Sequence, residues 1–308
     1  MLQRPPSAQL AAVDYPALDM QAEDNDPVPK FHPLFDSSEA DVVLGSHDGV
    51  LFRVHSYTLK TTSGWFKSMF SLPQKEEEDK KPDAATFQVT LYLDEDSAVL
   101  ESLFRCICGL PIPLLDSYDI IEPFLYAAEK YDMPGPLSII RALIMTPPML
   151  EDPLRLFVMA CRYGWVDIAQ LAATKTLTLN IFDASLRTTL KKLTTPSLLN
   201  LIDLHRARRD LLKQRLNEAP FVSDGPSSCS HCGSPVDYHT WRELKHAMIM
   251  EMDVRPLGDT ICEVNLADWP QARSCWEAKC STCSRVLYDR KETLIAIRNS
   301  IDGLQLSQ

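Results

Sequence analysis

Two pairs of cysteines near the end of the chain have a spacing that can bind a metal. Cys229 and Cys232 form one Cys-x-x-Cys pair, Cys280 and Cys283 form the other, and 47 residues separate the inner cysteines. One pair can place two thiolates on an ion, and two pairs complete a tetrahedral zinc site with Zn–S distances of about 2.3 Å. The spacing therefore predicts a structural zinc ion. Four thiolates leave no open position for a catalytic water.

Other interpretations of these cysteines stay open. They could be unliganded thiols in a helical tail, or a metal could use Cys262, Cys275 or His231. Redox exchange is the other chemistry of a Cys-x-x-Cys pair, but it is expected within a βαβ pattern that this sequence lacks. DNA binding by the tail is disfavoured, because residues 219–308 carry 9 basic and 12 acidic residues, whereas DNA-reading fingers are normally basic.

The residues around the two pairs predict their local structure. Gly233 follows the first pair and suits the turn of a zinc knuckle. The apolar pattern from Arg285 to Ile301 predicts a helix directly after the second pair, and another helix is expected from Trp241 to Met252. A knuckle followed by a pair that opens a helix resembles a treble-clef arrangement.

Composition excludes several functions for the whole chain. Its 308 residues carry 31 basic and 42 acidic side chains, a net charge of −11, which argues against general binding to a phosphate backbone. Neither common glycine-rich nucleotide-binding fingerprint is present. No apolar run reaches the length of a membrane span, and no secretory signal is expected. We therefore expect a cytoplasmic or nuclear protein with reduced cysteines.

The elements before the cysteines predict an α+β unit followed by helices. Residues 41–55 read as a β-hairpin around an Asp-Gly turn, residues 56–70 as a helix and residues 87–92 as a third strand. The predicted organisation is a disordered tail over 1–38, the α+β domain over 39–145, a helical extension over 150–218, a linker over 219–228 and the Cys-rich zinc-stabilised module over 229–301.

The α+β segment resembles the BTB/POZ domain, a fold with a short hairpin and sheet capped by helices. The residues that carry the resemblance follow the expected order of strands and helices. They are Asp41, Phe52, His55, Leu59, Ser63, Phe66, Met69 and Phe70, with the later stretches 103–109 and 125–133. The sequence at 71–74, 129–136 and 160–165 is also similar to a group of BTB proteins common in mushroom-forming (basidiomycete) fungi. In that group a helical region follows the BTB domain.

The resemblance implies assembly with a second BTB protein, either another copy of this chain or a relative. BTB domains commonly dimerise through their N-terminal strand and first helix, so Val42, Leu44 and Trp65 are candidate residues of a dimer surface near an exposed strand edge. We expect Asp41 to accept backbone N–H groups. We expect His55 to be a buried histidine that fixes the corner between strand and helix by hydrogen bonds, and not to be a catalytic base.

These observations predict a non-enzymatic protein–protein interaction protein. One alternative is a substrate adaptor of a cullin-type ubiquitin ligase. Such adaptors often carry an apolar–x–Glu motif, but Gln74 occupies the apolar position before Glu76. Another alternative is a transcription regulator with a BTB domain and zinc. An enzyme is not expected, since no nucleophile–base–acid set is recognisable. Five basic residues from Arg206 to Arg215 are expected to form a solvated helix face that interacts favourably with the helix dipole, with a nuclear-import signal as the alternative.

Overall fold

The computed structural model describes residues 30–72, 90–223, 227–262, 266 and 268–304, and these fall into two compact units. The described residues up to Tyr57, with those among residues 76–97, form the first unit. The described residues from Thr58 to Leu72, and those from Ala98 onward, form the second. Among the described residues, no helix is both long and apolar enough to cross a membrane.

The first unit contains a four-stranded sheet with the order β1-β3-β2-β4. Its strands are β1 (Lys30–Phe31), β2 (Val42–Gly45), β3 (Val50–Val54) and β4 (Thr90–Tyr92). The predicted hairpin is formed by β2 and β3, which pair antiparallel with Val42 opposite Val54. Gly49 takes the positive φ of 82° at the turn, which favours glycine.

The sequence-based boundary of the tail at residue 38 was wrong. Lys30 and Phe31 form β1 and pair in parallel with β3. Phe35 is buried, and its ring centroid lies 5.6 Å from that of Phe52. The sheet of the first unit therefore includes Lys30 and Phe31, which precede the predicted boundary. The prolines and acidic residues of this segment predicted disorder, and a strand of two residues is too short to show a periodic apolar pattern.

The predicted helix over 56–70 is two helices, α1 (Ser56–Thr62) and α2 (Gly64–Phe70). Ser63 separates them, because its hydroxyl accepts a hydrogen bond from the Phe66 N–H at 3.0 Å and donates one to the Tyr131 carbonyl at 2.5 Å. A serine at this position caps the second helix. The break also leaves no room for a side chain at Gly64, where a Cβ would lie 1.8 Å from a carboxylate oxygen of Asp132.

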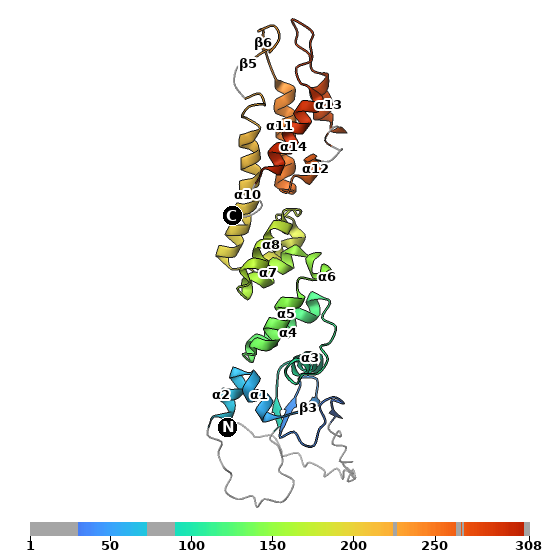
Figure 1. Ribbon diagram of the computed structural model, residues 1–308, viewed down its shortest axis with the longest axis vertical. Coiled ribbons are helices and arrows are strands. Elements are labelled where there is room, and N and C mark those ends of the chain that lie inside the picture. Colours follow the sequence, from blue (N-terminus) through green and yellow to red (C-terminus); the bar gives the residue numbers. More distant parts are fainter. Residues whose placement is uncertain (1–29, 73–89, 224–226, 263–265, 267, 305–308) are drawn as a thin grey trace, which may run out of the picture. The chain divides into compact units, whose positions relative to one another are not determined.

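The second unit continues as a succession of helices, whose order Figure 1 shows. These are α3 (Ser97–Ile107), α4 (Tyr118–Lys130), α5 (Pro134–Leu143), α6 (Pro147–Leu150), α7 (Pro153–Arg162), α8 (Val166–Thr176), the 3-10 helix η1 (Ala184–Leu186), α9 (Arg187–Leu190) and α10 (Thr195–Arg215). Asp152 caps α7 by accepting the Arg155 N–H at 3.0 Å, and Gly164 has a positive φ of 66° between α7 and α8.

Ion pairs connect α4 to the helices after residue 150. Arg155 on α7 lies 2.9 Å from Asp119 and 3.0 Å from Glu122, both on α4. About two helical turns further along each helix, Arg162 lies 2.7 Å from Glu129. The predicted boundary between residues 145 and 150 is therefore bridged by polar contacts.

From residue 227 onward, the described residues form a second small sheet and a group of α-helices. These are β5 (Ser227–Ser228), β6 (Pro235–Val236), α11 (His239–Val254), α12 (Asp259–Cys262), α13 (Pro270–Glu277) and α14 (Arg290–Asp302). Leu212 and Leu216 belong to the same buried cluster as Trp241, Met248 and Ile297. The last turns of α10 are therefore part of the core of the Cys-rich module.

The segment predicted as a linker, 219–228, is packed in part. Phe221 stacks on Trp241 with ring centroids 5.2 Å apart, and the Trp241 indole N–H donates to the Val222 carbonyl at 3.1 Å. Proline, glycine and serine correctly indicated a non-helical segment. They did not indicate that its one aromatic residue would be held by the module that follows.

Candidate functional site

The structure brings the four predicted cysteines into one cluster. The Sγ atoms of Cys229, Cys232, Cys280 and Cys283 all lie within 4.8 Å of one another. Two of the separations are 3.8 Å, from Cys229 to Cys283, and 3.7 Å, from Cys232 to Cys280. A tetrahedron with Zn–S distances of about 2.3 Å has edges of about 3.8 Å. The arrangement of the thiols therefore fits a tetrahedral metal ion.

The first pair lies in a tight turn between β5 and β6. The Cys229 N–H donates to the Ser234 carbonyl at 2.8 Å, and the Gly233 N–H donates to the Cys229 carbonyl at 2.9 Å. Gly233 has a φ of 72°, which lets the chain turn back immediately after Cys232. Both thiols of the pair consequently face the same side of the turn.

The second pair lies in a turn of the same kind as the first. The expectation of a treble-clef arrangement is therefore wrong. The Cys280 N–H donates to the Arg285 carbonyl and the Ser284 N–H to the Cys280 carbonyl, each at 2.9 Å. Lys279 and Val286 then form an isolated antiparallel bridge. The helix predicted from Arg285 begins only at Arg290, where Asp289 caps α14. The site is thus built from two similar knuckles.

Two tyrosines join the knuckles to the helices. Tyr238 directly precedes α11, and its hydroxyl donates to the Ser228 carbonyl in β5 at 3.2 Å. Tyr288 follows the second knuckle, and the two rings meet edge to face with centroids 5.7 Å apart. The cysteines alone did not indicate this pair, although each tyrosine lies five or six residues after a knuckle cysteine.

The protonation of the cluster is uneven. Hydrogen bonds from the side chain and the backbone N–H of Ser234 lower the pKa of Cys232 to about 6. The backbone N–H of Arg285 favours the thiolate of Cys283, but burial and the neighbouring thiols outweigh it and raise the pKa of Cys283 to about 11. Sulfurs this close cannot all be thiolates without a positive charge between them. A divalent cation would supply that charge.

The other candidate ligands lie outside this cluster. Among the described residues, these four cysteines are the one group of metal-ligand type whose donor atoms converge. Cys275 is fully buried, and burial raises the pKa of its thiol to about 12. His231 is exposed, and its Nδ1 lies 3.1 Å from a guanidinium nitrogen of Arg285.

The corner between β3 and α1 is held by Asp41 and not by His55. One carboxylate oxygen of Asp41 accepts the Ser56 N–H at 2.7 Å, and the other accepts the Ser56 hydroxyl at 2.5 Å. Partial burial opposes ionisation, but these hydrogen bonds outweigh it and lower the pKa of Asp41. His55 is exposed, so the expectation of a buried histidine is not met. The serine one position later provides both donors.

The remaining apolar signature residues are buried or partly buried, each within its own unit. Phe52, Leu59 and Phe66 are fully buried, whereas Met69 and Phe70 are partly buried. The ring of Phe66 stacks between those of Phe70 and Tyr131, with centroid distances of 6.1 and 5.6 Å. The hairpin is followed by helical structure over 56–70, in the order that the sequence predicts, although the predicted single helix is two.

The comparison with protein families agrees with this arrangement. Residues 31–146 match the family model of the BTB/POZ domain. The matched range begins within β1. The BTB domain therefore supplies the small sheet and the first helices, and a mostly helical region with the cysteine cluster follows it. The comparison with curated proteins found no match.

The candidate dimer residues of the BTB domain differ in exposure. Leu44 is fully buried, and it lies on β2, which is flanked by β3 and β4 and is not an edge strand. Val42, on the same strand, is partly buried. Trp65 is 37% exposed, with its ring edge to face against Phe66 and Tyr131. Of the three, Trp65 keeps the largest accessible surface, and the expected strand edge at Leu44 is not present.

The motif expected of a cullin adaptor, from Gln74 to Glu76, lies outside the described residues.

Proposed function

We propose that this chain is a non-enzymatic interaction protein whose BTB domain pairs with a second BTB domain, either in another copy of the chain or in a relative. The match of residues 31–146 to the BTB/POZ family carries this proposal, because a BTB domain has a role in protein interaction. The helical region and the Cys-rich module then extend the dimer and provide a second surface for partners.

A structural zinc ion in the four-cysteine cluster is part of this proposal. The donor set consists of thiolates alone, and soft thiolate ligands in tetrahedral geometry select zinc or iron–sulfur chemistry. A site closed by four thiolates contributes to folding and not to catalysis. Cys229, Cys232, Cys280 and Cys283 would hold the ion, and the two knuckles would be fixed to each other by it.

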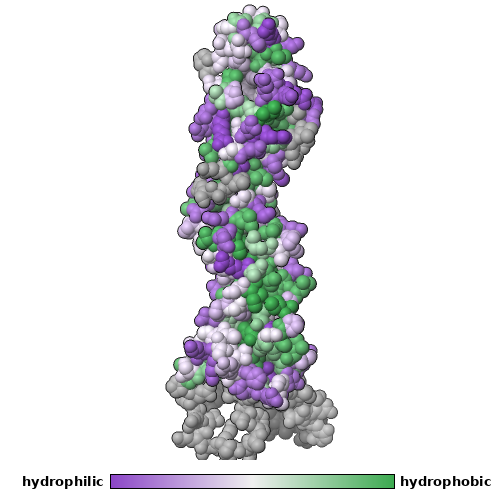
Figure 2. Space-filling view, in the orientation of Figure 1, coloured by the Kyte–Doolittle hydropathy of each residue, from purple (hydrophilic) through white to green (hydrophobic). Residues whose placement is uncertain are grey.

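Exposed apolar side chains of the BTB domain offer a surface for the partner. Figure 2 shows apolar residues gathered over the region of α5 and α6 and the loop before α4. In this region Leu114 is 77% exposed and Ile112 is 46% exposed. Trp65 adds an aromatic ring elsewhere on the domain. Contiguous exposed apolar surface is typical of protein-interaction sites.

Two narrower functions remain alternatives. One is a substrate adaptor of a cullin-type ubiquitin ligase, and the other is a transcription regulator that combines the BTB domain with zinc. The similarity to BTB proteins of mushroom-forming fungi rests on the three sequence stretches given above. No distance or charge in the described residues favours either narrower function over the general one.

Light scattering coupled to size-exclusion chromatography tests the proposed pairing. The full chain at micromolar concentration should elute with twice its monomer mass of 34.8 kDa. Leu114→Asp should shift the population toward monomer, since it places a charge in the apolar surface. Phe182→Asp, at an exposed apolar position outside the BTB domain, is the matched control and should stay dimeric. A purely monomeric parent chain would contradict self-pairing, and pull-down with mass spectrometry would then show whether another BTB protein is bound.

Elemental analysis tests the zinc site. Protein purified without chelator should contain one zinc ion per chain, and Cys280→Ser should reduce this strongly. Cys262→Ser is the matched control, because Cys262 lies outside the cluster and is only partly buried. Retention of a full zinc equivalent in Cys280→Ser would contradict the assignment of the ligands.

A further inference from the structure

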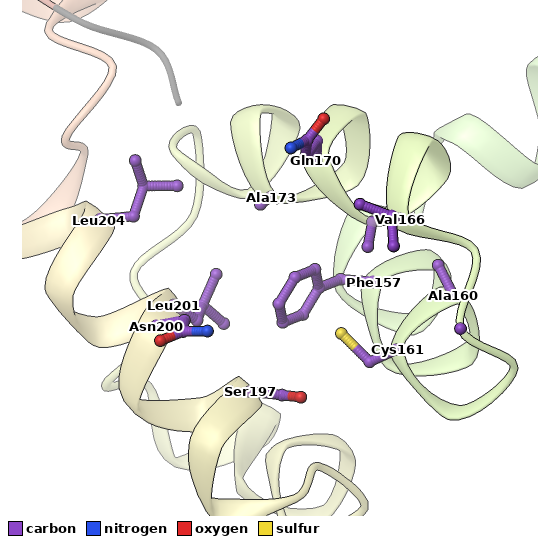
Figure 3. Close-up of a pocket in the computed structure, with 12 residues that line it drawn as sticks. Phe157, Ala160, Cys161, Val166, Gln170, Ala173, Ser197, Asn200, Leu201 and Leu204 are labelled. Atoms are coloured by element: carbon purple, nitrogen blue, oxygen red, sulfur yellow. The ribbon is translucent and has the colours of Figure 1, made fainter. Parts of the chain in front are cut away.

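A pocket of about 400 Å³ lies between α7, α8 and α10, within the second unit. Figure 3 shows the Phe157 ring projecting from α7 toward α10, where Leu201 faces it across the pocket. The sulfur of Cys161 points toward the same space. This volume falls in the range of small-molecule sites, about 300–1,000 Å³.

Each helix contributes one regular face to the pocket. The lining positions follow the spacing i, i+3, i+4, i+7 three times, so they are one stripe of each helix. They are Phe157, Ala160, Cys161 and Gly164 after α7, Val166, Ala169, Gln170 and Ala173 on α8, and Ser197, Asn200, Leu201 and Leu204 on α10. The pocket is consequently a defined space where three helix faces meet.

Small residues create this space. Ala160, Ala169, Ala173 and Gly164 line it where α7 and α8 pack, so the α10 side chains do not reach the opposite wall. Protein interiors are normally as dense as organic crystals. Larger apolar side chains at Ala169 or Ala173 would fill the gap, and the sequence has none there.

The lining has no charged group but keeps hydrogen-bonding capacity. No Asp, Glu, Lys, Arg or His is among the twelve residues. The walls are apolar, with an aromatic ring and a half-buried thiol whose pKa is raised by its burial. The side-chain amides of Gln170 and Asn200 lie at the rim, and neither hydrogen-bonds to another residue in the described part of the chain. An ion would lose its hydration here without gaining a counter-charge.

We propose that this pocket binds an uncharged, mainly apolar small molecule with one hydrogen-bonding group, of the size of a single substituted ring. The ring would pack between Phe157 and Leu201, and its polar group would reach the amide of Asn200. The proposal concerns the helical region alone and is independent of both the BTB pairing and the zinc site.

Three ring compounds that differ in charge test the proposal on the full chain. Benzyl alcohol is neutral, benzoate is an anion and benzylammonium is a cation at pH 7. Methyl NMR should show saturable shifts confined to Val166, Leu201 and Leu204 with benzyl alcohol. We expect its Kd to be at least tenfold lower than those of the two ions. Equal affinity for the three compounds, or no saturable shift at these methyl groups, would overturn the proposal.

Variants that fill the pocket provide the second arm. Ala173→Phe should weaken benzyl alcohol binding at least tenfold while the chain stays folded, since the new ring has space to occupy. Ala169→Leu makes the same test in case Ala173→Phe does not fold. Leu171→Phe on the same helix is the matched control, because Leu171 is exposed and does not line the pocket. Unchanged benzyl alcohol binding in both filling variants would contradict the assignment of the binding site to this pocket.

Discussion

Gly233 and Ser284 occupy the same position in the two knuckles, but only one of them is a glycine. Their φ angles are 72° and 60°. A left-handed conformation costs a residue with a Cβ about 1–2 kcal/mol, and glycine adopts it freely. Ser284 is therefore a strained residue that the surrounding knuckle holds in place.

Exchanging these residues should change stability in opposite directions. Ser284→Gly removes the strain but adds freedom to the unfolded chain, so we expect a gain of about 0.5–1 kcal/mol in the free energy of unfolding. Gly233→Ser introduces the strain and should cost about 1 kcal/mol. Urea denaturation of the metal-loaded protein measures both. Destabilisation by Ser284→Gly would show that the serine side chain contributes more than its backbone strain costs.

Asp48 is the carboxylate whose titration the sheet perturbs most clearly. Hydrogen bonds from Ser46 and from Ser97, at the start of α3, lower the pKa of Asp48 to about 2. A carboxyl with a lowered folded-state pKa contributes stability above its unfolded value near 4, and this contribution is lost as the pH falls through about 2. Carboxyl ¹³C NMR should therefore find a midpoint near 2, and Ser97→Ala should raise it. A midpoint near 4 in the parent chain would contradict these hydrogen bonds.

The burial and the hydrogen-bond partners of single residues were the features least predictable from the sequence. The four cysteines do lie in one cluster, and the turn of each Cys-x-x-Cys pair is a local feature that sequence can indicate. His55 was placed in the core, but it is exposed and Asp41 bonds to Ser56 instead. Alternation along a strand places a side chain on a face. It does not tell whether the last residue of the strand is covered by another element.

Among the helices, α10 is held to the Cys-rich module by a buried arginine. Arg208 is 2% exposed, and its guanidinium donates to the carbonyls of Pro256 at 2.9 Å, Leu257 at 3.0 Å and Leu304 at 3.2 Å. Arg215 adds a second such contact, with the Ser300 carbonyl at 2.6 Å. The expectation of a solvated basic face is therefore wrong for these two residues.

Removing this guanidinium should loosen the module. Arg208→Met keeps the apolar stem but leaves buried carbonyls without donors, each costing about 1–3 kcal/mol, so we expect a total loss of about 3 kcal/mol. Arg206→Met is the matched control on the exposed side of α10 and should stay within about 0.5 kcal/mol of the parent. Thermal denaturation compares them. Equal melting of both variants would show that the carbonyls find water instead.

Elements were more predictable than their contacts. The hairpin, the capped helix α7 and the long helix α10 follow from turn residues, caps and apolar spacing, which act within a few residues. The helix break at Ser63 depends on a hydrogen bond to the carbonyl of a residue far along the chain. The guanidinium groups of Arg208 and Arg215 likewise bind carbonyls that are distant in sequence. The sequence of a helix does not show whether a basic side chain is solvated or hydrogen-bonds to a carbonyl distant in the chain.

At the scale of the whole molecule, the metal should decide how much of the second unit is folded. The core of the Cys-rich module includes Leu212 and Leu216 of α10, and the tyrosines behind the two knuckles pack on each other. In zinc-finger peptides, a structural zinc contributes on the order of 10 kcal/mol to folding. The predicted linker does not isolate this core, because Phe221 and Val222 contact Trp241.

Chelation should therefore destabilise more than the cysteine tail. Hydrogen exchange on the reduced full chain should show lost protection in α11 and α14 and in the last turns of α10, because these share one core. The first half of α10 should keep its protection, since His205 lies 3.1 Å from Thr176 on α8 and Leu201 is buried there. Amides of β2 and β3, in the first unit, should not change. Protection that persists in α11 and α14 after complete metal removal would mean that apolar packing alone folds the module.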